Sequence, residues 1–286
     1  MWRLLVTVLI SSTCSLFAAD FSAGLNCYRA QDFECSIREW APLADAGAPQ
    51  IQYDLALAYT RAEGSPRNLE KAAQLLEQAS NAGMVEAQYN LAFMYLNGAG
   101  VAKNEDTAIS WLQKAAERGD INAAYGLGEV LEKKSDYGTA LQWYRKAAEA
   151  GLAVAEFSVG QMYDPGHGVS QDFSQAVSWY RKAADQGNAS ALCNLAILYY
   201  NGEGVPLDRE KSYLYFKVAA KAGEPRAANL IEAAANKLQK KQLESADEQV
   251  IAWEAAHPMH PAVSVTPPQE IISADAKVAL MSSDSE

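Results

Sequence analysis

Positive charge is scarce in this chain of 286 residues. Lysine and arginine together number 24, against 35 aspartates and glutamates, and the net charge at pH 7 is −11. Proteins that bind nucleic acid or anionic lipid need a basic surface for the phosphate groups, and this balance argues against both classes of partner. We therefore expect no nucleic acid partner and no docking on anionic lipid. A neutral or basic protein partner suits the charge better.

Histidine is equally rare, and the common catalytic motifs are missing. Of the three histidines, His257 and His260 lie three positions apart beside prolines, without a second pair of ligands near them in the sequence. A zinc site needs such a second pair, so we expect no metal. The patterns Gly-x-Ser-x-Gly, His-Glu-x-x-His and Ser-x-x-Lys do not occur. We therefore expect no catalytic residue, no cofactor and no enzymatic activity.

The apolar run at the N-terminus is too short to span a bilayer comfortably as a mature helix. Arg3 precedes the apolar residues 4–10, serines follow, and the small residues Ala18 and Ala19 end the stretch. This order is typical of a secretory signal peptide, which we assign to residues 1–19. An uncleaved anchor and a lipidated Cys14 are the alternatives. Loss of Arg3 with the signal would bring the net charge to −12. We expect a monomer in the periplasm or outside the cell, without stable membrane insertion after cleavage.

Cysteine is limited to four residues, of which three follow the predicted signal peptide. Cys27 and Cys35 are close in sequence, and an exported chain meets an oxidising compartment, so the pair is predicted to form a disulfide. Cys193 takes a slot that tyrosine or phenylalanine fills elsewhere in the chain. We therefore interpret Cys193 as a buried apolar side chain.

Glycine, in contrast, recurs at an almost constant interval. The spacings are 36, 36, 32, 36 and 36 residues along one series: Gly47, Gly83, Gly119, Gly151, Gly187 and Gly223. Eight residues before the later glycines stands an aromatic residue, at Trp111, Trp143, Trp179 and Tyr215, and two alanines follow it. A repeat of this length is one supersecondary unit that buries its apolar face only by stacking on its copies. The spacing predicts an all-α solenoid of stacked antiparallel helix pairs.

Residues 84–119 show how one unit is built. Ala87, Leu91 and Tyr95 recur four apart and predict a first helix, which the glycines of residues 97–100 end. Asn104 and the acids after it predict the start of a second helix, which carries a tryptophan and alanines at core spacing. A small residue follows the central leucine or valine of each first helix, where it lets two helices approach closely. The series is Ala56, Ala92, Gly128, Gly160 and Ala196.

The pattern Gly-x-Gly-Val, then a capping acid, then Ala-x-x-Trp-x-x-x-Ala-Ala-x-x-Gly resembles the Sel-one-like repeat family, which is related to the tetratricopeptide repeats. The resemblance covers about residues 25–256. It implies a right-handed superhelix of helix pairs that serves as a protein-interaction scaffold. Exported bacterial members often act in envelope assembly, signalling or host contact. The repeat at 120–151 is four residues short, and the turn near Gly64 holds a single glycine, so both depart from the family pattern.

These signals divide the chain after the signal peptide into a solenoid over residues 20–257 and a tail. The solenoid comprises a half unit, five repeats and a C-terminal cap, at residues 21–47, 48–83, 84–119, 120–151, 152–187, 188–223 and 224–257. Terminal units with a changed pattern are how solenoids close their ends. The tail, residues 258–286, is rich in proline, serine and acids, and its composition predicts disorder.

The candidate binding residues follow from the resemblance. In related stacks the first helices line a concave face, and asparagine amides there grip a peptide backbone. Asn90 and Asn194 match those asparagines, Asp54 shares their phase in the first repeat, and Phe93 and Ile197 would add apolar contacts. An amide suits this role because it both donates and accepts hydrogen bonds. The alternative is that the two asparagines bond only to neighbouring helices.

The sequence and the family resemblance are compatible with three functions. The leading one is an exported scaffold or adaptor of the bacterial cell envelope that holds a peptide or protein segment on the concave face. The second is an enzyme directed at the cell wall or at β-lactams, as discussed for cysteine-rich relatives, and it rests on family analogy alone. The third is a passive structural spacer in an envelope complex.

Overall fold

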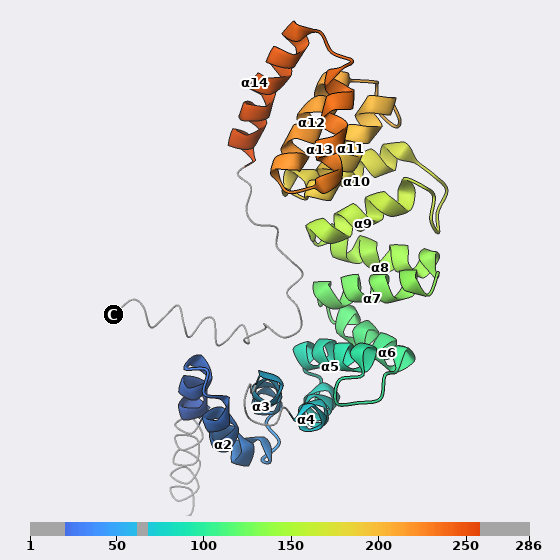
Figure 1. The fold of residues 1–286 in the computed structure, drawn as a ribbon. Coiled ribbons are helices and arrows are strands. Elements are labelled where there is room, and N and C mark those ends of the chain that lie inside the picture. Colours follow the sequence, from blue (N-terminus) through green and yellow to red (C-terminus); the bar gives the residue numbers. More distant parts are fainter. Residues whose placement is uncertain (1–20, 62–67, 258–286) are drawn as a thin grey trace, which may run out of the picture. The chain divides into compact units, whose positions relative to one another are not determined.

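The computed structural model describes residues 21–61 and 68–257 of the chain. The predicted signal peptide at 1–19, the tail at 258–286 and the Gly64 turn lie outside these residues. Throughout the described part the regular structure is helical, and no strand occurs in it, so the predicted all-α class is confirmed (Figure 1). The chain forms two compact units, which meet in sequence between Asp120 and Ile121.

The first unit contains a helical stretch at residues 21–29 and then five longer helices: α2 (Phe33–Ala44), α3 (Pro49–Arg61), α4 (Leu69–Asn81), α5 (Val85–Asn97) and α6 (Glu105–Glu117). Each helix from α2 onward packs against the next one along the chain. Trp40 is completely buried, and its indole N–H donates a hydrogen bond to the carbonyl of Phe21. This bond joins the two helices of the N-terminal half unit, and α2 in turn packs on α3.

The described residues of the second unit form eight helices: α7 (Ile121–Lys133), α8 (Tyr137–Glu149), α9 (Ala153–Tyr163), α10 (Phe173–Asp185), α11 (Ala189–Asn201), α12 (Arg209–Lys221), α13 (Pro225–Ala235) and α14 (Lys240–Ala256). Consecutive helices pack together from α7 to α13, and α14 packs on α12 (Figure 1). The predicted stacking of helix pairs is confirmed. Among the described residues no helix is both long enough and apolar enough to cross a membrane.

The helix boundaries follow from the capping residues. The Asn104 side chain accepts a hydrogen bond from the Thr107 backbone N–H at the start of α6, and Asp172 and Asp208 make the equivalent bond for α10 and α12. At the other end of a repeat's first helix, Gly202 adopts a left-handed conformation and stops α11. Gly204 follows with a φ of 69°, and a Cβ there would meet the Phe173 backbone at 2.4 Å. The first glycine therefore ends the helix, and the second permits close packing on the preceding repeat.

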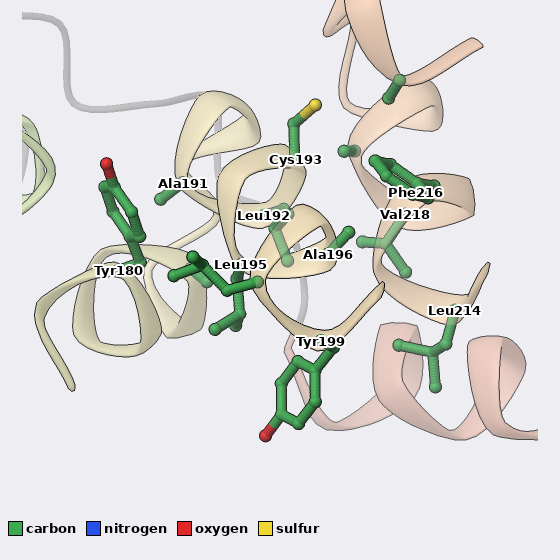
Figure 2. Packing of buried hydrophobic residues seen from close by; sticks show 14 of the residues in the cluster. Tyr180, Ala191, Leu192, Cys193, Leu195, Ala196, Tyr199, Leu214, Phe216 and Val218 are labelled. Carbon is green, nitrogen blue, oxygen red and sulfur yellow. The ribbon is translucent and has the colours of Figure 1, made fainter. Parts of the chain in front are cut away.

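The core of the second unit is built from alanines and large apolar side chains of α10, α11 and α12. Figure 2 shows Ala196 of α11 pointing toward α12, where Phe216 and Val218 lie. The Cys193 thiol is free and buried, as predicted. Trp111 and Trp179 are also buried, in agreement with a core role for the recurring aromatic position. A lysine ammonium lies 3.8 Å from the ring centroid of Trp111, Trp143 and Trp179, so each ring also forms a cation–π pair.

In the first four repeats the small residue of the first helix is matched in size to the residue that it faces on the second helix, whereas Ala196 of the fifth repeat faces the larger Phe216. A Cβ at Gly128 would lie 2.5 Å from the Tyr144 ring, and a Cβ at Gly160 would lie equally close to the Tyr180 ring. The corresponding positions are Ala56 and Leu76, then Ala92 and Leu112, in the first unit. Glycine thus occurs opposite tyrosine and alanine opposite leucine, which keeps packing close in both cases.

Candidate functional site

The five predicted binding residues lie on the first helices of repeats, and they divide between the two units. Asp54 belongs to α3, and Asn90 and Phe93 belong to α5, in the first unit. Asn194 and Ile197 belong to α11 in the second unit. In each unit, we call the surface formed by these positions the first-helix face of that unit.

Asn90 is buried in the first unit, with 4% of its surface exposed. Its Nδ2 group donates a hydrogen bond of 3.1 Å to the hydroxyl of Tyr53, one repeat earlier. Its Oδ1 atom is buried and accepts no hydrogen bond from any described residue. The donor half of this amide therefore links two repeats, while the acceptor half is unused. A buried acceptor without a partner is rare and costly, which makes it a candidate for binding.

Asp54 is buried near Tyr28, and 9% of its surface is exposed. The Gln50 side-chain N–H group donates to both carboxylate oxygens at 3.2 Å. Burial raises the pKa of Asp54 to about 7, although the Gln50 hydrogen bond lowers it. The Tyr28 hydroxyl is buried without a hydrogen-bond partner among the described residues. Burial raises its pKa, the charge of Arg61 lowers it, and the charge of Asp54 raises it further.

Asn194 in the second unit also donates to a tyrosine of the preceding repeat. Its Nδ2 group lies 3.1 Å from the hydroxyl of Tyr180, and that hydroxyl donates in turn to Asp164 at 3.1 Å. Burial is the main cause that raises the pKa of Tyr180. Both predicted asparagines therefore bond to side chains of neighbouring helices. Their contact with a partner stays a prediction.

Ile197 lines a hollow of about 270 Å³ on the first-helix face of the second unit. The other lining residues come from α11, α12 and α13, namely Tyr200, Asn201, Phe216, Leu230 and Ala233. Most of these side chains are apolar. Cofactor and drug-sized ligands occupy pockets of roughly 300–1,000 Å³, so this hollow suits a single apolar side chain better than a cofactor.

The tyrosine hydroxyls that accept hydrogen bonds from the asparagines, and the residues that complete the hollow, were not predicted from the sequence. Tyr53 recurs as Tyr89 and Tyr125 one repeat and two repeats later, and this periodic hydroxyl beside a periodic amide was the available signal. Leu230 gave no comparable signal, because α13 belongs to the cap, where the repeat pattern weakens. Tyr200 stands at a position that the repeats fill with different residue types.

The structure also places the cysteines and histidines. Cys27 and Cys35 form a disulfide with their Cα atoms 5.6 Å apart, as predicted. His257 stacks on Trp253, and its Nδ1 atom lies 2.9 Å from the Trp253 carbonyl oxygen. His260 is outside the described residues. Within residues 21–61 and 68–257 no group of three or more His, Cys, Asp or Glu side chains is arranged to hold a metal ion.

Comparisons with known proteins agree with this architecture. A crystal structure of a protective antigen present in uropathogenic Escherichia coli strains, which displays an SLR fold, is 28% identical and superposes with a TM-score of 0.73. The match covers 92% of this chain, which spans 58% of the length of that protein. A Sel1 repeat protein from Oxalobacter formigenes is 29% identical with a TM-score of 0.69, over 80% of this chain and 99% of the other. No curated protein matches the sequence.

The family model of the Sel1 repeat matches five segments of the chain, at residues 49–84, 85–120, 122–152, 153–188 and 189–224. Together the segments cover more than half of the sequence, and each contains one of the helix pairs described above. Proteins of this family are typically non-enzymatic scaffolds that bind protein partners. The chain belongs to the Sel1 repeat family.

Proposed function

We propose that this chain is an exported interaction scaffold of the bacterial cell envelope that binds a peptide or protein segment on its first-helix face. The observation that carries the proposal is the apolar hollow beside Ile197. Solvent-exposed apolar concavities with a few polar groups nearby are typical of binding sites. Asn194 lies one helical turn from Ile197 and supplies the neighbouring polar group.

The hollow fits a peptide anchor better than a catalytic function. Its lining holds no carboxylate, histidine or cysteine, so it offers no carboxyl or imidazole group for acid–base chemistry and no thiol nucleophile. Full burial of one large apolar side chain contributes about 1.5–3 kcal/mol. That contribution anchors one residue of a partner segment, and Asn194 is the candidate for a further contact in the second unit. In the first unit the candidates for binding are Asp54, Asn90 and Phe93. The net negative charge favours a neutral or basic segment.

A selection with a random peptide library on the full-length protein tests the proposal. We expect enriched peptides to share a large apolar residue. Ile197→Glu places a charge in the hollow and should weaken their binding at least tenfold, in line with about 1.5–3 kcal/mol for the anchor. Ile251→Glu is the matched control, because Ile251 lies on α14 of the same unit, is 68% exposed and does not line the hollow.

The binding proposal is wrong if no apolar residue is enriched, or if both variants bind the selected peptides as tightly as the wild type does. Circular dichroism of both variants checks that the helices are retained. Turnover of a chromogenic β-lactam by the purified protein would instead favour the enzymatic alternative.

Export is supported by the N-terminal sequence and by the disulfide, since such bonds persist mainly in oxidising compartments. Intact-mass measurement of protein recovered from the periplasm or the medium tests it. We expect a chain that starts near Ala19 or Asp20 and is lighter by the two hydrogens lost on forming the Cys27–Cys35 bond. Retention of residues 1–18 or a lipid on Cys14 would contradict the proposal.

A further inference from the structure

One position of the second helices changes its charge along the chain. It lies six residues before the glycine that ends each repeat. A basic residue occupies it in the last three repeats and a carboxylate in the first, and the series is Glu77, Gln113, Arg145, Arg181 and Lys217. The contacts of an arginine at this position therefore indicate which group the first repeat lacks.

In the fourth repeat this arginine bonds to the repeat that follows. The Arg181 guanidinium donates a hydrogen bond of 3.0 Å to the hydroxyl of Tyr199 on α11. Tyr199, which Figure 2 labels, is buried. The same two positions of the first unit hold Glu77 on α4 and Tyr95 on α5, and there Glu77 is exposed and Tyr95 only partly buried. An ionised carboxylate only accepts hydrogen bonds, so Glu77 does not replace the donor that Arg181 supplies.

A hollow of about 240 Å³ lies at these residues of the first unit, where α4 and α5 pack together (Figure 1). Glu70, Gln74 and Glu77 are spaced by four and three residues, so they share one face of α4, and all three are exposed. The hollow therefore combines an acidic rim, which a partner can reach, with an apolar interior. The complete lining is Glu70, Ala73, Gln74, Glu77, Leu91, Tyr95, Gly100 and Val101.

The loop after α5 forms one wall of this hollow because Gly100 lets it approach α4. Gly100 has a φ of 72°, and a Cβ there would lie 2.1 Å from the carbonyl oxygen of Leu69. Only glycine combines this conformation with so close a contact. Val101 follows it and adds an apolar side chain to the lining.

The two carboxylates of the rim have no cation beside them. Among the described residues no lysine or arginine lines the hollow, and neither Glu70 nor Glu77 forms an ion pair there. A cation placed between two carboxylates is attracted by both. The lining thus favours a ligand that carries a positive charge on an apolar stem.

We propose that this hollow binds an arginine side chain of a protein partner, between the carboxylates of Glu70 and Glu77 and the ring of Tyr95. A guanidinium group has five N–H donors in a planar fork, pairs with carboxylates through two bonds and stacks on aromatic rings. The partner supplies in the first unit the group that Arg181 supplies beside Tyr199 in the second. Lysine fits less well, because a compact ammonium offers neither the fork nor the stacking surface.

This inference goes beyond the proposed function, because it assigns a second site with a different chemistry. The hollow beside Ile197 lies in the second unit and is apolar, whereas this one lies in the first unit and is acidic at its rim. The net charge of the whole chain, −11, draws basic partners toward the protein.

Capped pentapeptides of arginine, lysine and citrulline test the proposal on the full-length protein. Citrulline keeps the shape of arginine without its charge. Binding is measured by fluorescence anisotropy at about 0.15 M salt, where attraction by distant charges is largely screened. We expect the arginine peptide to bind at least about threefold more tightly than the lysine peptide of equal charge, and the citrulline peptide to bind most weakly.

Two substitutions at the rim assign this preference to the hollow. Glu77→Gln removes one carboxylate and should weaken binding of the arginine peptide about fivefold. Glu77→Arg introduces the residue of the fourth repeat, whose guanidinium would itself occupy the hollow, and should weaken binding about tenfold or more. Circular dichroism checks that both variants keep their helices.

Glu34→Gln and Glu34→Arg are the matched controls. Glu34 is an exposed carboxylate on α2 of the same unit, does not line the hollow, and gives the same changes of net charge. Both controls should alter the affinity less than about twofold. Equal affinity of the wild type for the arginine and lysine peptides would overturn the arginine site. So would equal effects of the substitutions at positions 77 and 34, or unchanged binding by Glu77→Arg.

Discussion

Adding a single methyl group at Gly128 tests how closely the two helices of the short repeat are packed. A Cβ at this position would lie 2.5 and 2.6 Å from two ring carbons of Tyr144, and that ring is 1% exposed. Contacts below 3.0 Å force a shift, and the ring cannot move into solvent. Overpacking of this kind lowers the free energy of unfolding by about 1–3 kcal/mol, whereas replacing glycine by alanine in a helix raises it by up to about 1 kcal/mol. We therefore expect Gly128→Ala to destabilise the second unit by about 1–2 kcal/mol.

Urea denaturation followed by circular dichroism measures this change. With a slope of about 2 kcal/mol per molar urea, the midpoint should fall by about 0.5–1 M. Gly138→Ala is the control, because Gly138 lies in α8 and a Cβ there meets nothing within 4 Å. That variant keeps the gain in helix propensity without the clash, so its midpoint should stay or rise.

A double substitution separates the clash from other effects. Gly128→Ala with Tyr144→Leu recreates the alanine and leucine found at Ala92 and Leu112. The hydrogen bond from Tyr144 to Glu132 is lost in the single Tyr144→Leu variant and in the double variant, so its loss cancels in the double-mutant cycle. We expect the double variant to be more stable than the sum of the single effects by about 1 kcal/mol. A midpoint for Gly128→Ala as high as that of Gly138→Ala would refute the packing argument.

Three further predictions concern the first unit. Reduction of the Cys27–Cys35 bond should lower its stability by about 2–3 kcal/mol, because the closed loop is short, and thermal denaturation with and without reductant measures the loss. Asp54→Asn should stabilise the protein above pH 7 by on the order of 2–4 kcal/mol. Because burial raises the pKa of Asp54 to about 7, its contribution to stability is fully present below its ordinary pKa of 3.8 and is lost as the pH rises through about 7. Urea midpoints at about pH 4 and pH 8 test this. Asn90→Ala removes the buried bond to Tyr53 and should cost about 1–2 kcal/mol in the same assay, with no change if the bond is unimportant.

The fold was largely predictable from the sequence because its signals repeat. The glycine interval, the paired alanines and the asparagine or aspartate caps each indicate a local backbone requirement, and each signal recurs in at least four units, so the signals can be interpreted together. The helix start after Asn104 and the helix end at Gly98 occur where these residues predict them. Local chemistry decides such boundaries, so no knowledge of distant contacts was needed.

The candidate site was less predictable because it depends on contacts between repeats. The phase along a helix placed Asn90 and Asn194 on the first-helix face. It did not reveal that both amides donate to tyrosine hydroxyls or that Asn90 is buried. The hollow beside Ile197 needs Leu230 from the cap, whose pattern departs from the repeat. These features depend on side-chain packing between helices, which the periodicity of the sequence alone does not determine.

Photo-crosslinking with a selected peptide tests the scaffold function most directly. A photoreactive amino acid is placed at position 197 in the hollow, or at exposed position 251 on α14, and each protein is irradiated with the bound peptide. We expect a strong crosslink from position 197 to the apolar anchor of the peptide and little or none from position 251. Equal crosslinking from the two positions, or crosslinking from position 251 alone, would contradict binding on the first-helix face.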